Sequence, residues 1–82
     1  MRVVLVVEPA LFSAQVLSER IGSDRIILDA ATPVRAVRAL QAVLVDTVVI
    51  ALDKIEEAEY AMLVSAMHLV SPASRLVCLP AV

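Results

Sequence analysis

The chain has few of the residues on which several common classes of small protein depend. Its 82 residues include one Cys, one Gly, one His and no Trp, and Phe12 and Tyr60 are its only aromatic side chains. A lone Cys78 permits neither an intrachain disulfide nor a Cys-based zinc site. A single glycine excludes a glycine-rich phosphate loop. The sequence therefore excludes a disulfide scaffold, a Cys-based zinc module and a glycine-rich nucleotide-binding loop.

Long apolar runs and basic stripes are also missing. The longest apolar runs span five residues, as in 3–7, whereas a membrane-spanning helix needs about 20. Seven Lys and Arg against nine Asp and Glu give a net charge of −2, and the basic residues are spread along the chain. A nucleic-acid-binding surface normally has them clustered. The sequence therefore predicts a cytoplasmic protein that binds neither membranes nor nucleic acids.

What remains is dominated by Val, Ala, Leu and Ile. Hydrophobic residues make up 61% of the chain, which is ample for one buried core. Four apolar runs rich in β-branched residues predict strands at 3–7, 25–28, 47–52 and 75–79. The runs are continuous and do not alternate with polar residues. This pattern is typical of strands buried on both faces of a parallel sheet.

Three segments between these runs have helical spacing. They are predicted at Pro9–Ile21, from Thr32 to about Val43–Val45, and at Ile55–Val70. Gly22 stands at a stop position, and Thr32-Pro33 supplies a capping hydroxyl followed by a proline suited to the first turn. The order βαβαβαβ predicts one α/β domain over 1–82, with three layers and a four-stranded parallel sheet of order 2-1-3-4, the flavodoxin-like pattern.

Two carboxylates follow neighbouring strands of this predicted sheet. Glu8 follows the first strand and Asp53 the third, and the carboxyl ends of these strands meet where the winding direction switches. Such a pair could bind a hard divalent cation, and a carboxylate beside Mg²⁺ can attack a phosphoryl group. Turn formation and helix capping also explain both residues. Glu8 and Asp53 are thus candidate metal ligands, and Asp53 is a candidate phosphoacceptor.

Three stretches, 4–11, 29–32 and 48–53, resemble response-regulator receiver domains. The stretch 4–11 resembles the family's first strand with its acidic position, and 29–32 resembles the turn into its second helix. The stretch 48–53 resembles the strand that ends in the phosphoacceptor. The resemblance implies the phosphoacceptor position for Asp53 and a Mg²⁺-holding position for Glu8. Pro9 replaces the family's second acid, no Ser or Thr ends the fourth strand, and the lysine after a fifth strand has no counterpart.

These departures imply a degenerate, shortened receiver that lacks the last βα units. Phosphoryl transfer depends on positioning and on electrostatic stabilisation by metal and cations, and most of those parts are absent. We therefore expect a pseudo-receiver with a regulatory role, no catalytic residues and no cofactor. Mg²⁺ is expected as a cofactor only in the alternative in which Asp53 is a phosphorylatable switch.

The stretch 61–70 is apolar nearly all round a helical wheel. The face expected to pack against the sheet is that of Met62, Ala66 and Leu69. Strand four is expected to form an exposed sheet edge, which invites pairing with another chain. A homodimer would cover both features. Its predicted interface consists of Leu63, Val64, Met67, Val70, Leu76 and Cys78.

Two alternatives remain open at this point. The chain is a fragment if the surplus apolar surface faces a removed segment. The region from 28–32 through 48–52 is also similar to anti-sigma-factor-antagonist (STAS) domains, although Glu56-Glu57-Ala58 stand where that family has Ser-Gly. An antiparallel first strand would favour that family. The leading prediction is a non-enzymatic module that binds protein, most directly a second copy of itself.

Overall fold

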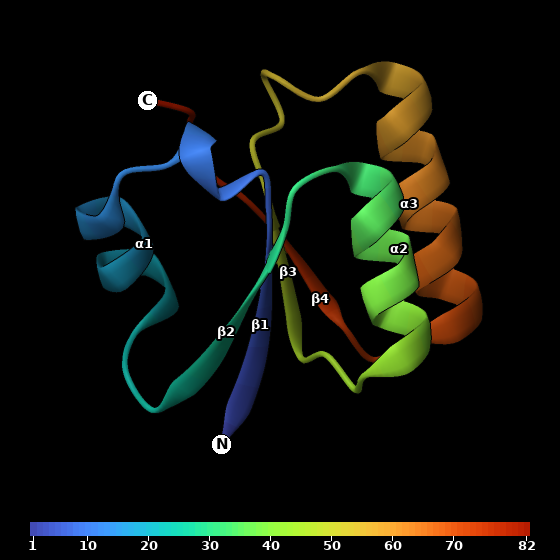
Figure 1. The fold of residues 1–82 in the computed structure, drawn as a ribbon, viewed down its shortest axis with the longest axis horizontal. Helices are drawn as coiled ribbons and strands as arrows, with labels where there is room; N and C mark the ends of the chain where they lie inside the picture. The colour runs from blue at the N-terminus through green and yellow to red at the C-terminus, as the bar shows by residue number, and fades with distance from the viewer.

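Strands and helices alternate along the whole chain. The structure is a computed structural model that describes all 82 residues. Its elements are β1 (Arg2–Val7), the 3-10 helix η1 (Pro9–Leu11), α1 (Ala14–Ile21), β2 (Arg25–Ala30), α2 (Pro33–Ala42), β3 (Thr47–Ile50), α3 (Glu57–Val70) and β4 (Arg75–Cys78). Figure 1 shows α2 and α3 side by side on one face of the sheet and α1 on the other.

The four strands form one sheet in the order β2-β1-β3-β4, and every pair is parallel. β1 lies inside the sheet, where Leu5 pairs with Leu28 of β2 on one side and with Val48 of β3 on the other. The predicted α/β fold and its strand order are confirmed. The antiparallel first strand that would favour a STAS-like domain is not observed.

The core has two layers because successive side chains of a strand point to opposite faces. Leu5 and Val7 of β1 join the cluster beneath α2 and α3, and Val4 and Val6 join the cluster beneath α1. All four side chains are buried. The continuous apolar run of β1 therefore reflects burial on both faces, as the sequence predicts for this strand.

β2 departs from that prediction. Ile26 and Ile27 remain 47% and 42% exposed, although they stand in a continuous apolar run. β2 is an edge strand, so only β1 shields its backbone and its side chains have neighbours on one side only. An apolar run thus identifies the strand but does not report its place in the sheet.

The first helix is shorter than predicted. Residues 9–11 form a separate 3-10 turn, and the α-helix begins only at Ala14. Glu8 has a left-handed backbone and Phe12 and Ser13 are extended, which interrupts the helical pattern. The Ser13 hydroxyl then accepts a hydrogen bond from the Val16 amide at 3.1 Å. This side-chain cap fixes the helix start inside the predicted segment.

The second helix follows its sequence signals closely. Thr32 is its N-cap, and the hydroxyl accepts a hydrogen bond from the Arg35 amide at 3.2 Å. Pro33 occupies the first turn, where its missing N–H costs nothing. The helix ends at Ala42, one residue before the predicted limit of 43–45. Capping chemistry therefore locates this element better than apolar spacing does.

The orientation predicted for α3 is wrong. Met62 and Leu69, expected against the sheet, are 36% and 85% exposed, whereas Leu63 and Met67 are buried in the core. A helix that is apolar all round carries no periodic signal to fix its rotation. Packing against α2 and the sheet decides the rotation instead, and it turns Leu63 and Met67 inward.

The segment after β4 returns to the α1 side of the molecule. Leu79 is buried in the same cluster as Phe12, and the Val82 amide donates a hydrogen bond to the Leu11 carbonyl at 2.7 Å. This bond joins the segment after β4 to η1. None of the helices combines the length and apolar character that crossing a membrane would take.

The rotation of α3 predicts unequal effects for two leucines. Leu63→Ala should lower the free energy of unfolding by about 2–5 kcal/mol, because a fully buried leucine leaves a cavity. Leu69→Ala should change it by less than about 0.5 kcal/mol, because that side chain is mostly in solvent. Urea denaturation of both variants measures the difference. Equal losses would contradict the observed rotation.

Candidate functional site

Glu8 directly follows β1 and precedes η1. It adopts a left-handed conformation (φ 56°, ψ 65°), and its amide donates a hydrogen bond to the Ala30 carbonyl at 2.7 Å. Its side chain lines a hollow of about 530 Å³ together with Asp29 and Arg35. Glu8 therefore belongs to the β1–β2 part of the carboxyl edge of the sheet.

Asp53 is exposed in the turn that follows β3. The amides of Lys54 and Ile55 donate to the Ala51 carbonyl at 3.0 and 3.1 Å, which closes this turn. Asp53 lines a separate, open hollow of about 380 Å³ whose other walls include Cys78. It therefore lies on the β3–β4 part of the same edge.

The structure does not bring Glu8 and Asp53 into one pocket. Nowhere in the chain do three His, Cys, Asp or Glu side chains gather in a group that could hold a metal ion. Mg²⁺ demands a near-ideal octahedron of oxygen ligands. The carboxyl neighbour that Glu8 does have is Asp29, which the parallel register places opposite Val6. That neighbour follows from strand pairing and could not be read from the local sequence.

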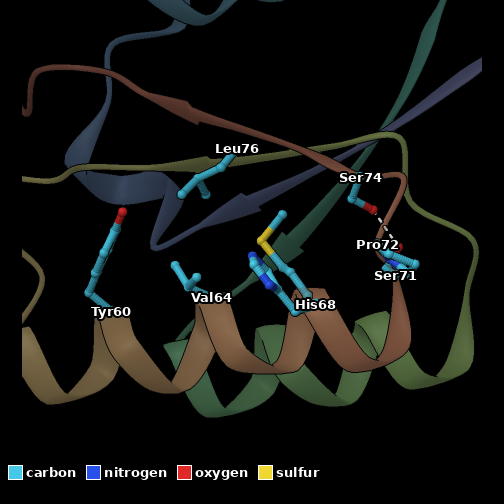
Figure 2. A pocket seen from close by; sticks show the side chains of 8 residues that line it. Tyr60, Val64, His68, Ser71, Pro72, Ser74 and Leu76 are labelled. Atoms are coloured by element: carbon cyan, nitrogen blue, oxygen red, sulfur yellow. Dashed lines mark hydrogen bonds between the residues drawn. The ribbon is translucent and has the colours of Figure 1, made fainter.

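A second candidate site lies between α3 and the edge strand β4. Figure 2 shows Tyr60, Val64 and His68 extending from α3 towards Leu76 of β4. We call this pocket of about 180 Å³ the edge groove. Its remaining lining residues are Met67, Ser71, Pro72 and Ser74.

One end of the edge groove is held closed by hydroxyl groups. Ser71 ends α3, and its hydroxyl is hydrogen-bonded to that of Ser74, as the dashed line in Figure 2 marks. Ser74 also donates to the Val45 carbonyl in the loop before β3. These bonds tie the loop between α3 and β4 to the body of the molecule. The groove therefore has a fixed end wall.

The outer side of β4 carries unpaired backbone groups. The amides of Arg75 and Leu79 donate to the Asp46 and Ile50 carbonyls, each at 2.9 Å, so these residues face β3. Hydrogen-bonding direction alternates along a strand, which turns the amides of Leu76 and Cys78 away from the sheet. β4 is the last strand on this side. Its edge is therefore open for pairing.

The predicted interface residues fall into different environments. Leu63 is buried inside the chain, so its assignment to an interface is wrong, for the reason given with the rotation of α3. Met67 is also buried, and it forms part of the groove lining. The structure places the others on or near the surface between α3 and β4: Val64 and Leu76 are half-buried, and Val70 and Cys78 are exposed.

Tyr60 and His68 line the edge groove but are not among the interface residues that the sequence predicts. Both lie on the side of α3 that also carries Val64, at helical spacings of four residues. The i, i+4 spacing of 60, 64 and 68 was available in the sequence. The spacing shows that the three residues share one side of α3, but only the folded sheet shows that β4 lies opposite that side.

No protein-family model, curated protein or solved structure matches this chain. The hollows at the carboxyl edge and the edge groove are therefore the features of the chain that bear on its function.

Because Glu8 and Asp53 line different hollows, we expect that Asp53 does not bind a phosphoryl analogue together with Mg²⁺. Addition of Mg²⁺ and beryllofluoride should leave the amide NMR signals of Asp53 and its neighbours unchanged, because this carboxylate belongs to no group of three metal-binding side chains and Glu8 lines a different hollow. A saturable shift confined to residues after β1 and β3 would contradict this expectation. Asp53→Asn provides the control, because it removes the acceptor carboxylate from an exposed turn.

Proposed function

We propose that this chain is a non-catalytic regulatory module, a receiver-like domain that associates with a second copy of itself through α3 and β4. The observation that carries the proposal is the open edge of β4 beside the edge groove. An added strand would satisfy the outward amides of Leu76 and Cys78. Its side chains would at the same time cover the apolar wall formed by Val64 and Leu76.

A two-fold axis at Val77 fits the backbone of β4. In an antiparallel pair centred there, Leu76 of each copy stands opposite Cys78 of the other, and both residues use their outward amides and carbonyls. Both side chains lie on the α3 face, so the two grooves adjoin across the axis. Isologous association of this kind closes on itself and yields a dimer.

The energy available at this surface is adequate for association. Each backbone hydrogen bond formed adds about 0.5–1.5 kcal/mol net. Fully burying a Val or Leu side chain adds about 1.5–3 kcal/mol. Val64 and Leu76 are half-buried in the single chain, so association would add the part of this energy that comes from burying their remaining exposed surface. The Tyr60 ring supplies further apolar area at low entropic cost.

A regulatory role without catalysis is supported by the carboxyl edge. Glu8 and Asp53 line different hollows, and Pro9 stands at the position where receiver domains carry a second acid. Leu79 and Pro80 follow β4 without a hydroxyl side chain. The parts that phosphoryl transfer needs are thus not assembled at Asp53. A switch that uses Asp53 and Mg²⁺ is the alternative, tested by the beryllofluoride experiment.

Cys78 allows a test of strand pairing that hardly alters the folded chain. Cys78→Pro removes an amide that points away from β3, so the intrachain ladder keeps its bonds while the dimer loses two. We expect the dimer dissociation constant, measured by analytical ultracentrifugation, to rise about tenfold or more. Cys78→Ser, which keeps the amide, should dimerise like the natural chain. A natural chain that is monomeric at micromolar concentration would contradict self-association.

A second pair of variants tests the edge groove. Val64→Glu places a charge in the groove wall, and we expect it to weaken the dimer by about tenfold or more, because the charge would be desolvated on pairing. Leu69→Glu makes the same kind of change on an exposed part of the same helix and should leave the dimer intact. If Leu69→Glu weakens the dimer and Val64→Glu does not, a different face of α3 is used.

A further inference from the structure

Three arginines from three separate elements converge on one pocket. Arg2 of β1, Arg20 of α1 and Arg75 of β4 line a pocket of about 160 Å³ on the α1 side of the sheet. Arg2 and Arg75 are the first residues of their strands. The pocket therefore opens at the amino ends of the strands, the opposite edge from Glu8 and Asp53.

No acidic side chain balances this charge in the pocket. Its other lining residues are Val4, Ile21, Thr47, Val49 and Val77. The whole chain has nine acidic residues against seven basic ones, yet none of the nine lines this pocket. Guanidinium groups repel one another when no anion stands between them. The arrangement is thus stabilised by any anion that enters.

The hydrogen-bonding capacity of the pocket is largely unused. Arg2 donates one bond to the Ile21 carbonyl at 2.8 Å, at the end of α1. It is the only guanidinium in the chain that makes a hydrogen bond within the chain. Arg25 stands opposite Arg2 in the β1–β2 register and has a buried Nε without any partner, but it does not line this pocket. Arg20 and Arg75 keep their donors free for a ligand.

The floor of the pocket is apolar. Val4 and Val49 are buried beneath it, and Val77 is partly buried beside them. A wall of low polarizability strengthens charge-assisted hydrogen bonds formed above it. The Thr47 hydroxyl adds a neutral donor at the same level of the sheet, because Thr47 pairs with Arg75 in the β3–β4 register.

We propose that this pocket binds a phosphoryl group. Three guanidinium groups approach from different elements, and a tetrahedral phosphoryl group offers them three terminal oxygens and a charge of about −1.5 to −2 at neutral pH. A carboxylate offers two coplanar oxygens and one charge. The three-sided arrangement of donors therefore matches the phosphoryl group better. This site is separate from the edge groove and does not depend on the association of two copies.

The test is an NMR titration of the natural chain with inorganic phosphate at constant ionic strength. Saturable shifts of the Ile21 and Thr47 amides are expected. Arg20→Gln should weaken binding about tenfold, because it removes one charge-assisted donor without touching the Arg2–Ile21 bond. Arg38→Gln removes the same charge from another exposed helical position, outside the pocket, and should bind phosphate like the natural chain.

Further ligands separate the sources of the phosphoryl group. Tighter binding of phenyl phosphate than of phosphate indicates a small phosphate ester, and tighter binding of a phosphoserine peptide indicates a phosphorylated protein. Equal binding of all three indicates the free ion. The proposal is overturned if phosphate gives no saturable shift, if acetate binds as tightly as phosphate, or if Arg38→Gln weakens binding as much as Arg20→Gln.

Discussion

The parallel pairing of β1 with both of its neighbours is the constraint on which the rest of the structure depends. Leu5 is completely buried because β2 and β3 flank it and a helical layer lies above it. Parallel pairing obliges each connection to cross a face of the sheet, and the crossovers put α2 and α3 on one face and α1 on the other. The loops after the strands are consequently gathered at one edge and the strand starts at the opposite edge.

How far the sequence could predict this fold depends on the kind of signal at each element. Continuous β-branched runs located the strands, and Thr32 with Pro33 located α2 by capping chemistry that acts over a few residues. The rotation of α3 could not be predicted, because an apolar residue stands at almost every position of 61–70. Leu63 was therefore assigned to a surface although the fold buries it.

The candidate sites also differ in whether the sequence alone could identify them. Glu8 and Asp53 were identifiable because each follows a strand, but Glu8 lines a hollow with Asp29 and Arg35, whereas Asp53 lines one with Cys78. The arginine pocket could not be found from the sequence, where Arg2, Arg20 and Arg75 are far apart and form no motif. Strand register and the end of α1 bring them together. Spatial convergence of this kind depends on the tertiary fold alone.

The hydrogen bond between the Val82 amide and the Leu11 carbonyl has a mechanical consequence. It links the segment after β4 to η1, and η1 follows Glu8 without an intervening residue. The segment that follows the edge strand β4 and the segment that follows Glu8 are thus joined by a backbone hydrogen bond. Loss of this bond would remove the backbone link between the segment after β4 and η1, and would leave that segment held by the packing of Leu79 in the cluster that contains Phe12.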